Sequence, residues 1–185
     1  MKLILGFVGH GASGKGAASD YVIKKHNAGY FRFSKMLYDL VTRLYLPADR
    51  NNLIRMSEIV RHEFGEDTLA RVMKEDVLHD EHQIICVDGI RRLADIAELR
   101  KVPGFKIIYI DTDIKIRYDR LIQRNEKPDD RTKTYEQFLA DEQRPTELSI
   151  DEVAREADYV ITNNGSLDEL YAQIDTIIQQ WTSPN

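Results

Sequence analysis

The chain has 185 residues, of which 42% are hydrophobic and 31% are charged, and its formal net charge at pH 7 is −5. This size suits one α/β domain with a core large enough to fold unaided, while the acidic balance argues against general nucleic-acid binding. A single cysteine excludes an internal disulfide and a zinc-finger framework, and no apolar run approaches membrane length, so we expect a cytoplasmic protein without membrane or nucleic-acid partners.

The first predicted elements are a strand, a phosphate-binding loop and a helix. An apolar run over residues 3–8 precedes the sequence GHGASGKG at residues 9–16, and a helical segment follows. Glycines let successive N–H groups point inward around an anion at the positive end of a helix, and Lys15 adds a mobile charge for the β- and γ-phosphates of a nucleotide. The predicted ATP-binding residues of this segment are Gly9, Gly11, Ala12, Ser13, Gly14, Lys15, Gly16 and Ala17.

Two positions of this loop have further consequences. Gly16 stands where serine or threonine normally offers a hydroxyl to Mg²⁺. A Mg²⁺ ion that accompanies ATP would therefore be held by phosphate oxygens and waters, and oriented by carboxylates from elsewhere in the chain. His10 also lies within the loop, where we expect its backbone to matter more than its imidazole.

Five predicted strands alternate with helical patterns along the chain. The strands span residues 3–8, 30–33, 83–88, 105–111 and 159–162. Three helical patterns fill residues 34–79, between the second and third strands. Thr134 with Gln137, and Ser166 with Glu169, have the spacing of capping boxes at the starts of two later helices. Strands and helices in this order imply a parallel sheet with right-handed crossovers.

The third predicted strand ends in Asp88, and Arg91 and Arg92 follow closely. Ligands bind at the carboxyl ends of parallel strands, so Asp88 would lie beside the phosphate loop and could orient Mg²⁺-bound water. The planar fork of arginine binds two phosphate oxygens at once and stays ionised, which makes both arginines candidates for holding a phosphate. The alternative to a phosphate-binding role is that both arginines are simply solvated in the first turn of a helix. The first turn of a helix prefers acidic residues, which argues against this alternative.

Residues 14–16, Gly-Lys-Gly, resemble the loop of adenylate kinases and related nucleoside monophosphate kinases. Residues 88–92 resemble the Asp-Gly-Phe-Pro-Arg element of adenylate kinases, whose last arginine holds the phosphate of the acceptor, and this match favours Arg92. The same residues also resemble an Asp-Gly-Ile-Arg pattern in kinase-like domains fused to deoxycytidylate deaminases and in small archaeal P-loop proteins, which favours Arg91. By analogy with nucleoside monophosphate kinases, residues 34–79 would form an acceptor-binding lobe, with Ser34 as the N-cap of its first helix and an acceptor contact.

The kinase-like domains fused to deoxycytidylate deaminases and the archaeal P-loop proteins are similar to most of this chain. They have a segment like residues 60–70, which implies that Arg61 contacts the acceptor. Residues 157–170 also resemble dephospho-CoA kinases and a phage deoxynucleoside monophosphate kinase. The residues that this second match would place near the adenine of the donor are Asn163, Asn164 and Gly165. A polar turn that caps a helix explains the same three residues structurally.

A polar stretch at residues 124–144, interrupted by proline, would be a lid that closes over the donor phosphates and excludes water. Four arginines bracket it. By position, Arg120 and Arg124 match the lid-helix arginines of nucleotide kinases, and Arg144 resembles an arginine after the lid of dephospho-CoA kinases. Arg124 and Arg131 are the predicted catalytic arginines, together with Lys15 and Asp88, but the sequence does not decide which of the four take part.

The chain is therefore predicted to be a single three-layer α/β/α P-loop kinase domain. Its predicted parts are the core at 1–33, 80–123 and 145–181, the acceptor lobe at 34–79 and the lid at 124–144. The predicted function is transfer of the γ-phosphoryl of ATP, with Mg²⁺, to a nucleoside monophosphate, most specifically a deoxynucleotide. Dephospho-CoA kinase is one alternative, which would need a general base for a ribose hydroxyl, and a nucleotide-binding sensor is another. The acceptor's base and sugar and the oligomeric state stay open.

Overall fold

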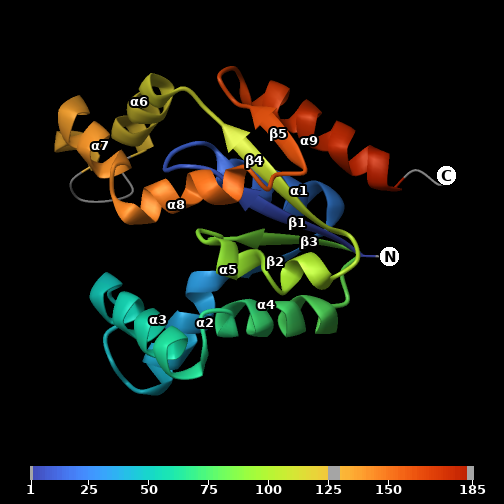
Figure 1. Ribbon diagram of the computed structural model, residues 1–185. Coiled ribbons are helices and arrows are strands. Elements are labelled where there is room, and N and C mark those ends of the chain that lie inside the picture. The colour runs from blue at the N-terminus through green and yellow to red at the C-terminus, as the bar shows by residue number, and fades with distance from the viewer. Residues whose placement is uncertain (1, 125–129, 183–185) are drawn as a thin grey trace.

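The computed structural model describes residues 2–124 and 130–182 (Figure 1). Residues 125–129 of the predicted lid lie outside the described residues. None of the helices in these ranges combines the length and the apolar character that crossing a bilayer requires.

The centre of the molecule is a five-stranded sheet in which every pairing is parallel. The strands are β1 (Leu3–Val8), β2 (Gly29–Arg32), β3 (Ile84–Asp88), β4 (Phe105–Asp111) and β5 (Tyr159–Thr162). Their spatial order is β2-β3-β1-β4-β5, so β1 is the central strand. All six residues of β1 are buried, because helices cover both faces of the sheet, and this explains the continuous apolar run in the sequence.

Two helical layers enclose the sheet. On one face α1 (Lys15–His26) and α9 (Leu167–Thr182) pack against the strands through buried side chains such as Val22 and Ile174. On the other face lie α4 (Thr68–His79), α5 (Leu93–Ile96), the short helix η1 (Leu99–Lys101) and α8 (Pro145–Ala154). Figure 1 shows α1 and α9 behind the sheet and α4, α5 and α8 along its other side. The predicted three-layer α/β/α fold with five parallel strands is confirmed.

A helical extension stands between β2 and β3, formed by α2 (Phe33–Arg43), α3 (Arg50–Phe64) and α4. This is the predicted helical block at residues 34–79. The predicted N-cap is wrong: α2 begins at Phe33, with Arg32 at the N-cap, and Ser34 lies inside its first turn. The helix begins earlier because β2 runs directly into it and the Phe33 side chain, only 5% exposed, is drawn into the core.

A second extension consists of α6 (Ile114–Arg124), η2 (Asp130–Thr132) and α7 (Tyr135–Glu142), at the upper left of Figure 1. The Tyr118 ring of α6 packs against Tyr135 and Phe138 of α7, with ring centroids 5.1 and 5.7 Å apart. These aromatic contacts hold the two helices together. Both predicted capping boxes are present, one at the start of α7 and one before α9.

Candidate functional site

The loop between β1 and α1 has a backbone that only glycine suits at two positions. Gly14 has φ 103°, and a Cβ there would lie 2.3 Å from the Asn163 side-chain nitrogen. A Cβ on Gly9 would lie 2.6 Å from the Ser13 hydroxyl oxygen and 2.8 Å from the Ile110 carbonyl oxygen. Any side chain at either position would therefore collide with its surroundings. The glycines of the phosphate-loop pattern are required by the folded loop itself.

The outer side of the loop is open. Apart from the glycine itself, its chain neighbours and the adjacent helix backbone, no atom of the described residues comes within 4 Å of the point where a Cβ on Gly11 or Gly16 would stand. The Lys15 side chain folds back over the loop, and its ammonium donates to the carbonyl oxygens of Gly9 at 2.6 Å and His10 at 2.8 Å. The loop thus has the free space and the charge that an anion at the N-terminus of α1 needs.

The inner side of the loop is held by the residues that directly follow β4 and β5. The Ser13 carbonyl oxygen accepts hydrogen bonds from the Asn163 side-chain amide at 2.7 Å and from the Thr112 hydroxyl at 3.0 Å. Asn163 is only 3% exposed. The structure therefore places Asn163 beneath the phosphate loop as a support, whereas the sequence resemblance placed it beside an adenine.

The other two residues of this turn lie toward α6. The Asn164 side-chain oxygen accepts from the Asp113 backbone N–H at 2.9 Å, just before α6 begins. The Gly165 carbonyl oxygen accepts from the Arg120 guanidinium at 3.4 Å. The Arg120 Nη1 atom is buried without a hydrogen-bond partner among the described residues, and this burial lowers the pKa of Arg120. Two of the predicted donor-binding positions, Arg120 and Gly165, are thus in contact.

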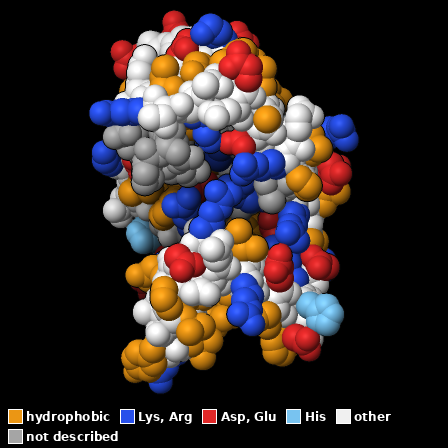
Figure 2. Space-filling view, turned by 90° about the vertical axis from the view of Figure 1, so that its left-hand side faces the viewer, with side chains coloured by type: hydrophobic (Ala, Val, Ile, Leu, Met, Phe, Trp, Pro, Cys, Tyr) orange, Lys and Arg blue, Asp and Glu red, His pale blue; other side chains and the backbone are white. Residues whose placement is uncertain are grey.

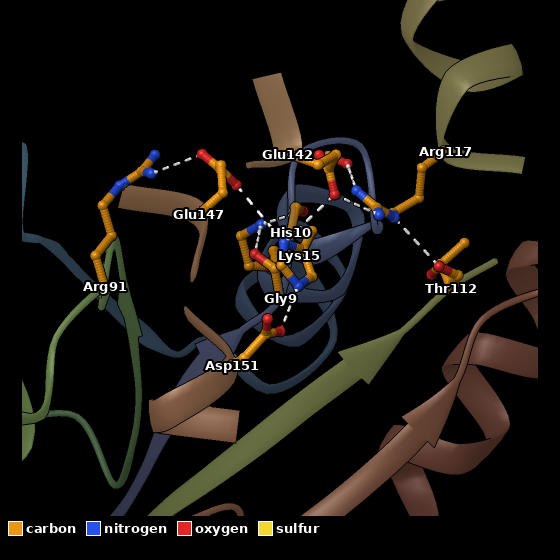
Figure 3. A network of polar contacts seen from close by, with 10 residues as sticks. Gly9, His10, Lys15, Arg91, Thr112, Arg117, Glu142, Glu147 and Asp151 are labelled. Atoms are coloured by element: carbon orange, nitrogen blue, oxygen red, sulfur yellow. Dashed lines mark hydrogen bonds and ion pairs between the residues drawn. The ribbon is translucent and has the colours of Figure 1, made fainter. Parts of the chain in front are cut away.

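His10 is the centre of a polar network that joins the phosphate loop to α7 and α8 (Figure 3). Its Nε2 lies 2.8 Å from an Asp151 carboxylate oxygen, and its Nδ1 lies 3.6 Å from Glu142 and 3.7 Å from Glu147. Glu147, Asp151 and Glu142 together raise the pKa of His10, against the effects of burial and of Arg117. The imidazole makes all of these contacts, while the carbonyl oxygen of His10 accepts from Lys15 and from the Ser13 backbone N–H.

Arg117 connects the same network to the base of α6. Its guanidinium lies 2.6 Å from the Glu142 carboxylate, and it also donates to the carbonyl oxygens of Thr112 at 3.2 Å and Gly11 at 3.4 Å. Arg117 is only 5% exposed. Sequence reasoning missed Arg117 and its acidic neighbours. The available signal was its spacing of three residues from Arg120, which puts both arginines on one side of α6.

Asp88 lies at the carboxyl end of β3, next to the central strand β1. One of its oxygens accepts from the Gly89 backbone N–H at 2.7 Å. The other accepts from the Tyr30 hydroxyl at 3.0 Å and lies 3.4 Å from the Arg32 guanidinium. Burial, with the charge and hydrogen bond of Asp88, raises the pKa of Tyr30 to about 12. Asp88 therefore stands at the predicted edge of the sheet, bound to two side chains of β2.

Arg61 is placed inside the protein. Its Nη2 lies 2.6 Å from an Asp95 carboxylate oxygen, and its Nη1 donates to the Glu66 carbonyl oxygen at 2.6 Å. The exposed fractions of the Arg61 and Asp95 side chains are 7% and 3%. The second Asp95 oxygen accepts from the backbone N–H groups of Arg91 at 2.9 Å and Arg92 at 3.0 Å. Arg61 thus fixes the segment that carries both arginines.

The side chains of Arg91 and Arg92 are about half exposed and point to different neighbours. The Arg91 guanidinium lies 3.4 Å from the Glu147 carboxylate, which connects it to the His10 network. The Arg92 guanidinium lies 3.6 Å from the Glu66 carboxylate, just beyond the end of α3. Only Arg91 therefore reaches toward the phosphate loop.

The remaining predicted residues lie on the two extensions. Arg144 is exposed and ion-paired with Asp141 at 2.6 Å, Arg131 is exposed in η2, and Arg124 is the last residue of α6. Ser34 is half-buried in the first turn of α2. Figure 2 shows lysine and arginine side chains gathered across the middle of the face between the two extensions. Such a surface attracts anionic ligands.

Comparison with known proteins supports the fold and gives sequence relatives and, separately, structures of similar fold. No family model matches the chain. A UPF0200 protein of Methanoregula boonei is 29% identical over 176 residues, which are 95% of either chain. Shikimate kinase of Bacteroides thetaiotaomicron superposes with a TM-score of 0.60 at 14% identity, covering 96% of this chain and 98% of that one. Shikimate kinase of Acinetobacter baumannii, solved with shikimate, gives a TM-score of 0.57 at 15% identity, covering 100% and 97%. The chain thus has the fold of P-loop kinases.

Proposed function

We propose that this protein is an ATP-dependent P-loop kinase whose acceptor is a nucleoside monophosphate, with deoxynucleotides as the preferred class. The observation that carries the proposal is the pairing of an open phosphate loop with three arginines at the neighbouring strand ends. Arg32 ends β2, and Arg91 and Arg92 follow β3, with side chains that are 56%, 54% and 48% exposed. At the carboxyl ends of the strands, a bound donor would lie at the phosphate loop and an anionic acceptor would lie at the three arginines.

The donor side would consist of the loop amides, Lys15 and Arg120. Phosphoryl transfer requires mainly positioning and positive charge, because its transition state spreads negative charge over the non-bridging oxygens. Lys15 lies close enough to the loop to turn from its carbonyls to a phosphate. Arg120, whose buried Nη1 has no hydrogen-bond partner among the described residues, offers a further donor beside Gly165. The other arginines of the predicted lid, Arg124, Arg131 and Arg144, would add positive charge around the donor phosphates.

The donor set also suits Mg²⁺ held mainly by phosphates and water. Gly16 offers no hydroxyl, and both oxygens of Asp88 already accept hydrogen bonds, so Asp88 fits a ligand that acts through water. When bound with ATP, Mg²⁺ would neutralise charge on the phosphate oxygens. The Arg32 guanidinium, 3.4 Å from Asp88, orients this carboxylate.

The acceptor side favours a phosphate over a hydroxyl. A hydroxyl acceptor, as in a dephospho-CoA kinase, needs a general base. Asp88, the carboxylate at the end of β3, is engaged with Tyr30 and Arg32, and β2 itself ends in an arginine. An acceptor phosphate is a competent nucleophile at neutral pH and needs only to be held, for which bidentate arginines are well suited. Arg91, nearest the phosphate loop, is the first candidate for this role.

A coupled assay of ADP release tests the proposal. The panel contains the common ribo- and deoxynucleoside monophosphates, dephospho-CoA and shikimate, each with ATP and Mg²⁺. We expect at least one deoxynucleoside monophosphate to stimulate ADP release more than the alcohols do, and Lys15→Ala to abolish the stimulation. Lys24→Ala, an exposed lysine of the same helix, is the control. Stimulation by dephospho-CoA alone would identify that alternative, and ATP binding without any acceptor effect would support a sensor.

A further inference from the structure

Among the described residues, one cluster beside the phosphates' expected place has the composition of a metal site. It consists of His10 in the phosphate loop, Glu142 at the end of α7 and Glu147 in α8. One donor atom from each, His10 Nδ1 and one oxygen of either glutamate, lies within 4.8 Å of the others. The two donor distances from Nδ1 are 3.6 Å and 3.7 Å. These separations are too long for hydrogen bonds but are close to those between ligands that share one ion at roughly 2 Å.

Two of these three donor atoms lack a hydrogen-bond partner. His10 Nδ1 and one oxygen of Glu147 are both buried, and neither has a partner among the described residues. The two atoms form an ion pair 3.7 Å apart, which is longer than a hydrogen bond, and a ligand shared between them would satisfy both buried atoms. Because three side chains converge from the loop, α7 and α8, the cluster is also preformed by the fold (Figure 3).

Each of the three side chains is held in place by a further residue. The second ring nitrogen of His10 lies 2.8 Å from Asp151, which is the carboxylate–histidine arrangement that orients histidine ligands in metalloproteins. Arg117 lies 2.6 Å from Glu142, and Arg91 lies 3.4 Å from Glu147. These contacts fix the direction of the donor atoms, as the outer residues of a metal site do.

We propose that His10, Glu142 and Glu147 form a binding site for one divalent transition-metal ion, with Asp151 orienting the histidine. One imidazole nitrogen and two carboxylate oxygens suit Mn²⁺, Co²⁺ or Zn²⁺ better than Mg²⁺, which prefers oxygen ligands alone. An ion there would join the phosphate loop to α7 and α8. Its remaining coordination positions would be open to water or to an anion. The site does not depend on the proposed kinase activity.

Metal titration of the whole chain tests this proposal without nucleotide. The protein is first stripped with a chelator and then titrated with Co²⁺ at pH 8, where visible absorption reports both binding and ligand geometry, and with Mn²⁺, Zn²⁺ and Mg²⁺ by calorimetry. We expect one bound ion per chain, with Mg²⁺ at least tenfold weaker than Mn²⁺. His10→Gln and Glu147→Gln should each weaken Co²⁺ binding more than tenfold. Asp151→Asn should weaken it by about 10- to 100-fold, the range for residues that orient a ligand.

The control is His62→Ala, which removes an exposed histidine that lies 2.9 Å from Glu63. It should bind Co²⁺ as the unchanged protein does, and thermal melts of all variants verify that they are folded. Absence of binding, or a Co²⁺ spectrum and affinity that His10→Gln leaves unchanged, would overturn the proposal. Equal affinity for Mg²⁺ and Mn²⁺ would also overturn it, because the imidazole would then not be a ligand.

Discussion

Replacing Arg61 with leucine separates a structural role for this residue from a role in binding the acceptor. The substitution leaves Asp95, only 3% exposed, without its charged partner. Loss of one member of a buried ion pair typically costs 3–5 kcal/mol. Two backbone N–H groups still bind the other Asp95 oxygen, so we expect about 3 kcal/mol, the lower end of that range. At about 2–4 °C per kcal/mol for a chain of this size, the melting temperature should fall by roughly 6–12 °C.

The assay is urea and thermal unfolding, followed by acceptor kinetics at a temperature where the variant is folded. Arg71→Leu is the matched control, because Arg71 is half-exposed and its ion pair with Asp67, at 3.6 Å, belongs to a class worth at most about 1 kcal/mol. Adding Asp95→Asn to Arg61→Leu should recover part of the lost stability, since the uncompensated charge is then removed. Unchanged stability with a tenfold loss of acceptor kcat/KM would refute this reasoning and make Arg61 a direct acceptor contact.

The remaining predictions concern the donor, the acceptor and the single cysteine. Lys15→Ala should lower turnover by about 10²-fold or more with the fold intact, while Lys24→Ala should have no such effect. Turnover of Lys15→Ala equal to that of the unchanged protein would contradict the phosphate-loop assignment. Arg91→Ala should cost about 2–4 kcal/mol in acceptor kcat/KM and leave ATP affinity nearly unchanged, and Arg92→Ala should cost less; the reverse order would favour Arg92. Burial raises the pKa of the Cys86 thiol to about 12 from 9.0. Thiol reagents should therefore not label the folded protein. As the pH rises, the Cys86 thiol of the unfolded chain loses its proton before that of the folded chain, and this favours unfolding. The free energy of unfolding should therefore fall between pH 9 and 12 more steeply than in Cys86→Ala, which urea melts across this pH range would measure.

Local sequence patterns were sufficient for most of the fold. The phosphate loop, the strand at residues 105–111 and the capping box of α7 each depend on neighbours within a few positions, and all three are present. The start of α2 was misjudged because the favourable capping residue, Ser34, competed with the burial of Phe33. A short-range preference of about 1 kcal/mol does not outweigh the burial of an aromatic side chain.

The side-chain network at the loop could not be predicted in the same way. His10 and Asp151 are 141 residues apart in the chain, and their contact depends on how α8 crosses the sheet. Arg61 and Asn163 were predicted as ligand contacts, but sequence alone does not tell a buried structural partner from a ligand contact. Whether residues 34–79 and 124–144 act as acceptor lobe and lid stays a prediction.

The support beneath the phosphate loop has a consequence for the order in which the protein becomes functional. The loop is synthesised well before the residue that supports it, because Ser13 is held by Asn163, 150 positions later. The neighbours of β1 also come from distant parts of the chain, since β3 and β4 flank it. Pairings of such long range form late, after their loop-closure cost has been met. A nascent chain on the ribosome therefore carries the complete phosphate-loop sequence long before it carries a rigid phosphate site.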